Sequence, residues 1–293
     1  MHYVSSRGIV YSCQYHNRFP HSSTNTVGFE INDTTVFPFL TTNVSTIYVC
    51  SSAINDFVAN YLPILKSRFV LVSGDSDATI PTDCMEASTI LLNHPNLIGW
   101  YSQNCVGTHP KLHHIPIGLD YHTMASRDTS WGKQTSPQDQ EDMLIRLNRL
   151  PFWQRNVKCY GNFHFAMNHR YAQIDRVDAK QSIPSSSIDY EESPIQREET
   201  WKKMSTYAFI PSPHGNGLDC HRTWEALALG CIVIVRTSPL DTMYNDLPVW
   251  IVQEWNEVTE ENMRKTIQRM QLINFDMQKI TLRYWLEKIK NGY

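Results

Sequence analysis

Short apolar runs rich in Val and Ile recur along the chain, and each is followed by polar or glycine-containing residues. In the first half they are STIYVC (45–50), RFVLVSG (68–74), NLIGWYS (96–102) and KLHHIPIG (111–118). In the second half they are VKCYGNF (157–163), TYAFIPS (206–212), CIVIV (231–235) and VWIVQ (249–253). Continuous apolar runs of this length are typical of strands that are buried on both faces of a parallel sheet.

Segments with helical periodicity lie between these runs. They are SSAINDFVANYLPILKS (51–67), EETWKKMS (198–205), RTWEALALG (222–230) and ENMRKTIQRMQ (261–271). Strands that alternate with helices indicate βαβ units, whose crossover helices cover the faces of a parallel sheet. The pattern therefore predicts an α/β fold.

The length of 293 residues favours two domains, because one domain usually takes about 100 to 200 residues. The segment 124–150 is rich in Ser, Thr, Gln and Pro and interrupts the alternation before a helix that starts near Pro137. We predict a first domain over 1–150 and a second over 151–275. The last residues, 276–293, are predicted to form an amphipathic C-terminal helix.

Composition and charge restrict the partners of the chain. Hydrophobic residues make up 41% and charged residues 19%, which is typical of a folded globular protein. The net charge of −3, with both signs scattered along the chain, favours neither nucleic acid nor a polybasic membrane anchor. The chain has no leader-like start and no apolar stretch of about 18 residues. Its seven Cys include no CxxC pair, which favours reduced thiols. These features predict a cytoplasmic protein without a transmembrane segment.

The stretch SPHGNGLDCHRTWEALALG (212–230) joins a predicted strand to a predicted helix. Ligands of parallel sheets bind at this end of the strands, where helix N-termini present unpaired amides. Gly215 and Gly217 allow the backbone to approach a ligand, and Asp219 can cap the helix. The expected ligand is an anion.

Arg222 and Glu225 refine this prediction. Arg222 falls in the first turn of the helix, where its guanidinium can bind a phosphate in bidentate fashion. Glu225 lies one turn further on the same face, and a carboxylate beside a phosphate suits the hydroxyls of a ribose. The alternative is that the two side chains pair with each other on a solvated helix, which is the usual result of this spacing. Neither GxxxxGK[ST] nor GxGxxG occurs in the loop.

The segment FIPSPHGNGLDCHRTWEALALGCIVIV resembles the donor-binding half of exostosin-like glycosyltransferases, glycosyltransferase family 47, and looks closest to homologues from large algal DNA viruses. The resemblance is specific over 207–255 and looser over the first half. It implies the GT-B arrangement, in which two Rossmann-like domains face each other across a cleft. The acceptor would bind the first domain and a nucleoside-diphosphate sugar the second, with the final helix crossing back. A viral origin would place the protein in the host cytoplasm.

The same resemblance suggests roles for residues of the second domain. Arg222 would hold the diphosphate and Glu225 the ribose. The donor-binding residues of the preceding loop would be Ser212, His214, Asn216 and Gly217.

Asp75 and Asp77 are the candidate catalytic residues. They belong to SGDSD (73–77), which ends a predicted strand of the first domain. A carboxylate there is suited to deprotonate an acceptor hydroxyl, and Asp75 is favoured because Gly74 allows a tight turn before it. Asp77 is better placed to cap the next helix. The Asp-x-Asp spacing also permits a metal site, which we favour less.

Two other polar stretches are weaker candidates. The run QNCVGTHPKLHHIPIGLDYH (103–122) contains four histidines but no tight zinc pattern, and it is predicted to line the acceptor side or to contact the donor phosphates. In GNFHFAMNHRYAQ (161–173), Asn168 and Arg170 are predicted at the start of a helix. Arg170 is therefore a second candidate ligand of the diphosphate.

The sequence thus predicts transfer of a monosaccharide from a nucleoside-diphosphate sugar to a hydroxyl of a glycan. By family analogy the donor is a UDP-sugar, UDP-xylose being the first choice, and the reaction is inverting, with no cofactor and no metal. One alternative is a metal-dependent phosphoesterase that uses Asp75, Asp77 and the histidine run. The other is a non-catalytic module that binds a nucleotide or a glycan.

Overall fold

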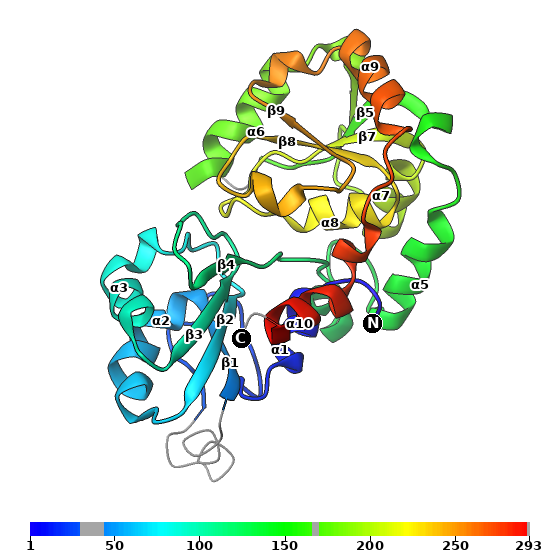
Figure 1. Ribbon diagram of the computed structural model, residues 1–293. Helices are drawn as coiled ribbons and strands as arrows, with labels where there is room; N and C mark the ends of the chain where they lie inside the picture. The colour runs from blue at the N-terminus through cyan, green and yellow to red at the C-terminus, as the bar shows by residue number, and fades with distance from the viewer. Residues whose placement is uncertain (30–43, 166–169, 292–293) are drawn as a thin grey trace. The chain divides into compact units, whose positions relative to one another are not determined.

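The computed structural model describes residues 1–29, 44–165 and 170–291 and divides the chain into two compact units. One unit, called here the 118–281 unit, comprises Met1–Tyr3 and Gly118–Thr281. The other, called the 4–117 unit, comprises Val4–Ile117 and Leu282–Tyr293. Both contain a parallel sheet covered by helices (Figure 1), which confirms the predicted α/β class with two sheet-centred units.

The sheet of the 4–117 unit has the strand order β1-β2-β3-β4, and every neighbouring pair is parallel. The strands are β1 (Val44–Cys50), β2 (Arg68–Gly74), β3 (Leu97–Ser102) and β4 (Leu112–His114). The helices are α1 (Ser6–Ser12), α2 (Ile54–Asp56) continued by a π-helical turn (Phe57–Tyr61), α3 (Met85–Asn93) and α10 (Leu282–Asn291). Helices α2 and α3 cover one face of the sheet, and α1 and α10 lie together on the other (Figure 1).

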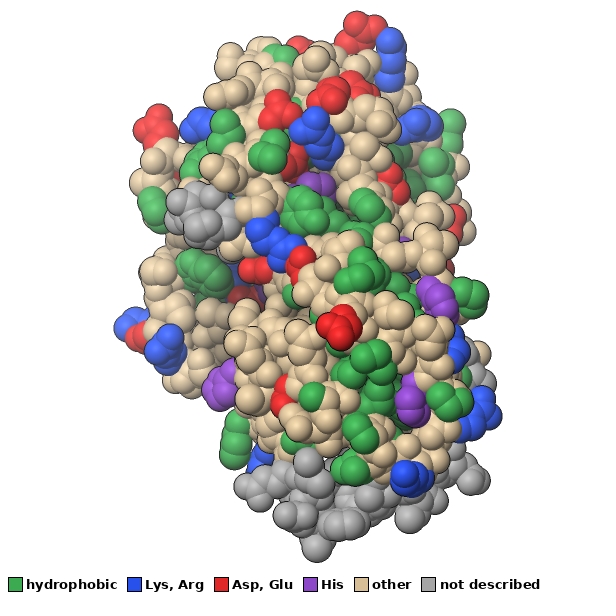
Figure 2. Space-filling view, turned by 90° about the vertical axis from the view of Figure 1, so that its left-hand side faces the viewer, with side chains coloured by type: hydrophobic (Ala, Val, Ile, Leu, Met, Phe, Trp, Pro, Cys, Tyr) green, Lys and Arg blue, Asp and Glu red, His purple; other side chains and the backbone are tan. Residues whose placement is uncertain are grey.

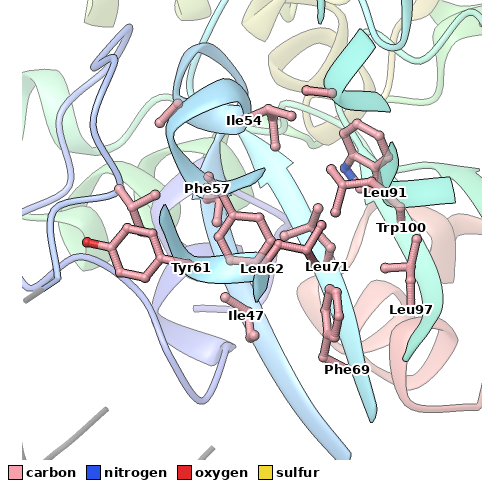
Figure 3. Packing of buried hydrophobic residues seen from close by; sticks show 14 of the residues in the cluster. Ile47, Ile54, Phe57, Tyr61, Leu62, Phe69, Leu71, Leu91, Leu97 and Trp100 are labelled. Atoms are coloured by element: carbon pink, nitrogen blue, oxygen red, sulfur yellow. The ribbon is translucent and has the colours of Figure 1, made fainter. Parts of the chain in front are cut away.

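The core of this unit lies between the sheet and the α2–α3 side (Figure 3). Ile47, Phe69 and Leu71 project from the strands toward Ile54 and Phe57 of the helical segment. All five are 1% exposed or less, and each buried aliphatic or aromatic side chain of this size contributes about 1.5 to 3 kcal/mol. Val70 and Val72, which alternate with Phe69 and Leu71 along β2, are 0% exposed, so both faces of this strand are buried, as its continuous apolar run requires.

The sheet of the 118–281 unit has the order β6-β5-β7-β8-β9 and is also entirely parallel. Its strands are β5 (Asn156–Gly161), β6 (Ile188–Tyr190), β7 (Tyr207–Pro211), β8 (Ile232–Arg236) and β9 (Val249–Val252). Its helices are α4 (His122–Ser126), α5 (Pro137–Leu147), α6 (Arg170–Ser182), α7 (Arg197–Met204), α8 (His221–Ala228) and α9 (Glu260–Met270). Figure 1 shows α6 and α9 on one face of the sheet and α8 on the other.

The chain reverses its direction of winding at β5. From β5 it passes to β6 on one side, and β7, β8 and β9 then follow on the other side. In open parallel sheets the ligand crevice forms at this kind of switch point, outside the carboxyl ends of the strands. The ends of β5 and β7 are therefore the place to look for a site in this unit.

The predicted strands are confirmed, with two differences at the margins. The run KLHHIPIG forms only the three-residue β4, because Pro116 has no amide hydrogen for a strand ladder. Strand β6 is absent from the sequence prediction, since three residues are too short to show a periodic pattern. The final helix begins at Leu282 rather than near residue 276, after a 3₁₀ turn over Met277–Ile280.

The unit boundary lies at Gly118, not at residue 150. The polar segment predicted as a transition is tied into the 118–281 unit by buried hydrogen bonds. Gln140 donates to the carbonyl of Tyr121 at 2.9 Å, and the hydroxyl of Tyr121 donates to Glu141 at 3.2 Å. Asn148 donates to the carbonyl of Ala228 at 3.1 Å. A polar composition does not distinguish a linker from a segment held by such bonds.

Charged side chains of both signs are interspersed on the face of the molecule in Figure 2. The same mixing is seen along the sequence, with 26 Lys and Arg against 29 Asp and Glu. Among the described residues, no helix has both the length and the apolar character needed to cross a bilayer.

Candidate functional site

The candidate site lies at the carboxyl ends of β5 and β7 in the 118–281 unit. The segment 162–165 follows β5, and the segment 212–220 follows β7 and leads into α8. Helix α6 starts close behind the first segment, and its buried residues Asp175 and Arg176 contact the second. Loops from both strands of the switch point therefore meet at α6.

Ser212 and His214, two predicted ligands, hold the loop in place. Ser212 shares a hydrogen bond of 2.9 Å with the hydroxyl of Thr223. The amide of His214 donates to Asp175 Oδ2 at 2.7 Å, and its ring Nδ1 donates to the carbonyl of Leu218 at 2.9 Å. Both side chains are buried, so their role in the free protein is to fix the shape of the loop.

Asp219 is not the cap of α8, which corrects the prediction. The N-cap is Cys220, and it makes no side-chain capping bond. The buried carboxylate of Asp219 accepts from the amide of Cys220 at 2.9 Å and from the indole of Trp224 at 3.0 Å. The hydroxyl of Tyr244 donates to it at 3.4 Å. The indole and the phenol compete for the carboxylate and draw it inward from the helix terminus.

Gly215 is closely packed. A Cβ atom there would lie 3.3 Å from Cys220 Sγ, 3.4 Å from Arg176 Nη2 and 3.6 Å from the carbonyl oxygen of the predicted ligand Gly217. A Cβ at this position would press on the sulfur and touch the guanidinium. The missing side chain therefore allows Arg176 to lie directly against the loop.

Arg222 carries an unsatisfied charge. Its Nη1 is buried and has no hydrogen-bond partner among the described residues, and its guanidinium lies 5.6 Å from the centre of the Phe163 ring. Burial, and next the neighbouring charge of Arg176, lower the pKa of Arg222 to about 10, so it remains a cation at neutral pH. A buried unpaired donor is costly, and it is expected where a ligand completes the bonding.

Arg176 is the second cation of the site. It is 3% exposed, and it donates to two backbone carbonyls, that of His164 at 2.7 Å and that of His214 at 3.1 Å. Neither bond neutralises its charge. Two positively charged guanidinium groups thus act on each other at the switch point, an arrangement that a polyanion would stabilise.

Asn216 adds a neutral polar group to this pair. It lies in the loop after β7, and its Oδ1 is buried without a hydrogen-bond partner in the part of the chain that the structure describes. A carbonyl oxygen of this kind accepts a hydroxyl or an N–H group of a ligand. The site therefore combines two cationic donors with one acceptor.

The pKa of His164 responds to the charges of the two arginines. Burial, together with the charges of Arg176 and Arg222, lowers its pKa below the usual value. Its imidazole is therefore neutral at pH 7 in the free protein.

We expect anion binding to reverse the shift at His164, because a diphosphate neutralises the two arginines and favours the imidazolium form. Between the lowered pKa of His164 in the free protein and its higher pKa in the complex, UDP should therefore bind with uptake of a proton, and its affinity should gain from acidification. Calorimetry in buffers of different ionisation enthalpy measures the proton number. His164→Gln should abolish this uptake, and an unchanged proton number in that variant would contradict the assignment.

Glu225 is not paired with Arg222. Within the described part of the chain no residue donates a hydrogen bond to its carboxylate, and the cation within 4.0 Å of Oε1 is Arg197, through its Nε. The charge of Glu225 also acts on Arg222, as the weakest of the influences on the Arg222 pKa. The alternative that Arg222 and Glu225 form a simple surface pair is therefore wrong. Glu225 is 9% exposed, so a carboxylate with unused acceptor capacity lies in an enclosed position.

A second polar cluster surrounds the start of α8. Asp120 Oδ2 accepts from Arg197 Nη2 at 3.0 Å, and Asp120 Oδ1 lies 3.1 Å from His122 Nδ1. Burial alone would raise the pKa of Asp120, but His221, Arg197 and His122 outweigh it and hold the pKa well below the usual range. His221, the first residue of α8, donates from Nδ1 to the carbonyl of Gly118 at 2.7 Å. Asp120 is thus a permanent anion beside two histidines.

The remaining predicted residues lie elsewhere. Asp75 follows β2 in the 4–117 unit, adopts a φ of 56° and forms a buried ion pair with Arg7. Asp77 is exposed in the same unit. Arg170 is exposed at the start of α6 and lies 5.6 Å from the Tyr171 ring, whereas Asn168 falls outside the described residues. The catalytic role of Asp75 or Asp77 stays a prediction.

The histidine run is divided between the units. His113 and His114 lie in the 4–117 unit, where burial and the charge of Lys288 lower their pKa values. His122 belongs to the other unit, beside Asp120. Over residues 1–29, 44–165 and 170–291, no three His, Cys, Asp or Glu side chains form a group that could hold a metal ion.

Sequence reasoning misses Asp175, Arg176 and Arg197. The first two are adjacent polar residues in the middle of α6, where a charged pair normally indicates a solvated surface. The available signal is that Ala172, Asp175, Arg176 and Ala179 recur at helical spacing and share the buried face. Arg197 gives no such signal, since its partners Asp120 and Glu225 are distant in sequence.

Comparisons with known proteins give the fold some context. No protein-family model matches the sequence, and no curated protein matches it. Among solved structures, the chain is similar to an alpha,alpha-trehalose-phosphate synthase (UDP-forming) from Burkholderia vietnamiensis, with 10% identity, 87% of this chain and 69% of that chain covered, and a TM-score of 0.37. The corresponding synthase from Burkholderia xenovorans, in complex with glucose-6-phosphate, is 9% identical over 88% of this chain and 72% of that chain, with a TM-score of 0.34. AviGT4, a glycosyltransferase involved in avilamycin A biosynthesis, is 10% identical over 82% of this chain and 88% of that chain, with a TM-score of 0.27. Likeness at this level identifies no relative, and the function is inferred from the site.

Proposed function

We propose that the chain is a glycosyltransferase whose 118–281 unit binds a nucleoside-diphosphate sugar. The observation that carries the proposal is the pair of Arg222 and Arg176 at the switch point. Two enclosed cations that donate to no carboxylate within the described ranges, one of them with a buried Nη1 that lacks a hydrogen-bond partner there, suit the diphosphate of a nucleotide donor. The function of such a pair is to stabilise the negative charge that develops on the leaving diphosphate.

Glu225 and Asn216 extend the proposal from a diphosphate to a nucleotide sugar. The enclosed carboxylate of Glu225 accepts hydrogen bonds from the two hydroxyls of a ribose, one helical turn from Arg222. The buried Oδ1 of Asn216 accepts one more hydrogen bond from the donor. We take UDP as the nucleotide and a glycan hydroxyl as the acceptor, with UDP-xylose as the first donor to test and inversion as the expected stereochemistry.

Calorimetry with UDP, uridine and inorganic pyrophosphate tests this assignment. The wild type should bind UDP, and Glu225→Gln should weaken UDP by about 0.5 to 1.5 kcal/mol, the value of one or two neutral hydrogen bonds, while leaving pyrophosphate unaffected. Because two guanidinium groups supply the positive charge, the titration should give the same affinity in EDTA. The proposed site would be refuted if the wild type did not bind UDP. It would also be refuted if Glu225→Gln weakened pyrophosphate binding as much as UDP binding.

A phosphoesterase is the alternative that the site supports less. It requires Asp75 and the histidines in one ligand set, and Asp75 is instead paired with Arg7. Loss of all activity with EDTA, restored by manganese, would favour that alternative.

A further inference from the structure

The cluster at the start of α8 contains a histidine whose proton-accepting nitrogen is fixed by the backbone. His221 Nδ1 lies 2.7 Å from the carbonyl oxygen of Gly118. A carbonyl only accepts hydrogen bonds, so Nδ1 carries the hydrogen, and in the neutral ring the lone pair is on Nε2. Within the described ranges no residue bonds to Nε2. The imidazole therefore presents a base whose orientation is set by the fold.

Asp120 supplies the charge that such a base needs. It is 4% exposed and held as an anion by Arg197 and its two histidine neighbours, and the charge of His221 is the largest of the influences that keep its pKa low. A fixed anion beside an imidazole stabilises the imidazolium formed when Nε2 takes up a proton. Asp120 thus acts on His221 without itself having to change its protonation state.

The position of His221 relates this base to the proposed reaction. It immediately precedes Arg222, so the two Cα atoms are about 3.8 Å apart, and it lies four residues before Glu225 on the same helical face. The base thus shares a helical face with the proposed ribose ligand Glu225, whereas the side chain of Arg222 leaves the helix about 100° away. A group that acts on the acceptor has to lie near the carbon that bears the leaving diphosphate.

We propose that His221 is the catalytic base of the transfer, an inference that rests on the proposed function. The acceptor hydroxyl gives its proton to His221 Nε2, and its oxygen forms a bond to the anomeric carbon of the donor. The bond from that carbon to the diphosphate breaks, and its electron pair leaves with UDP. The proton then passes from the imidazolium to solvent.

His221→Asn tests the proposal, because its side-chain amide still donates to Gly118 but has no basic nitrogen. We expect UDP to bind the variant within about threefold of wild type, while UDP release from UDP-xylose or UDP-glucose, with water or a glycan as acceptor, falls about 10²- to 10⁴-fold. His16→Asn is the matched control, because His16 Nδ1 likewise donates to a backbone carbonyl, that of Asn17 at 2.8 Å, in the 4–117 unit. The His16→Asn variant should keep the wild-type affinity for UDP and the wild-type rate of UDP release.

The pH profile separates catalysis from a purely structural role. Wild-type turnover should fall at acid pH as Nε2 becomes protonated, and His221→Asn should lack that limb. Asp120→Asn removes the anion that stabilises the imidazolium, so turnover should fall in that variant while UDP binding persists. The titratable side chains beside His221 are Asp120, whose charge interacts with it, and His122, whose ring centre lies 6.5 Å from that of His221; Arg197 contacts Asp120 from α7.

Nitrogen NMR of the wild type provides a readout that needs no turnover. The ring-nitrogen signals of His221 are assigned because they are missing from the spectrum of His221→Asn. In the neutral imidazole they should show the hydrogen on Nδ1. An Nε2–H tautomer would overturn the proposal, as would full donor turnover by His221→Asn or UDP binding by a wild type that turns over no sugar donor. If instead Asp75→Asn is inactive but folded and His221→Asn is active, the base is Asp75. Failure of the wild type to bind UDP would refute the proposed function itself.

Discussion

Replacing Arg222 with methionine is expected to weaken UDP binding about 10- to 100-fold while leaving the free energy of unfolding unchanged or higher. The affinity falls because a charge-assisted hydrogen bond to the diphosphate contributes about 1.5 to 3 kcal/mol. Stability does not fall, because Nη1 has no partner over residues 1–29, 44–165 and 170–291, so its desolvation is uncompensated. Methionine keeps contact with Phe163 without burying a charge. Calorimetry and urea unfolding measure the two effects.

Arg176→Met is the informative contrast to Arg222→Met. It should lose UDP affinity as well, but it should also destabilise the fold, because the carbonyls of His164 and His214 lose their donor. Arg170→Met tests the second ligand predicted from the sequence, and it should leave both quantities nearly unchanged because the side chain is exposed. If Arg222→Met binds UDP like wild type while Arg170→Met does not, the diphosphate site has been placed wrongly.

Replacing Asp175 with alanine is expected to lower the free energy of unfolding by about 2 to 6 kcal/mol, the cost of two buried donors left without acceptors. The donors are the amide of His214 and the indole of Trp255, each 2.7 Å from the carboxylate. The amide belongs to the loop that carries Asn216, so UDP affinity should fall in the protein that remains folded. Urea unfolding and calorimetry are again the measurements.

Asp178 offers a matched control for Asp175. It lies on the same helix and pairs with Arg236 at 2.7 Å, but it is 32% exposed in its side chain. An ion pair of that exposure contributes at most about 1 kcal/mol, so Asp178→Ala should be nearly neutral and should bind UDP normally. Equal destabilisation by the two substitutions would show that the loop is not held through Asp175.

The class of fold and the position of the loop at 212–220 follow from the sequence alone. Continuous apolar runs specify strands that are buried on both faces, and this signal is local, so β1, β2, β7 and β8 are predicted directly by it. Glycines and an arginine that directly follow such a strand indicate an anion site, and this signal is also contained in a short stretch of sequence. Arg222 and Glu225 can therefore be selected from their place in the chain.

Which groups share the site, and what each is bonded to, depends on the packing of the sheet and its helices. Arg176 reaches Arg222 from another helix, Asp120 reaches His221 across 101 positions of sequence, and Asp219 is drawn to Trp224 and Tyr244 instead of capping α8. Each of these outcomes is a competition among partners that are distant in the chain. Hydrogen bonds and charges act over a few ångströms in space, whereas the periodic pattern of a sequence reports only burial along one element.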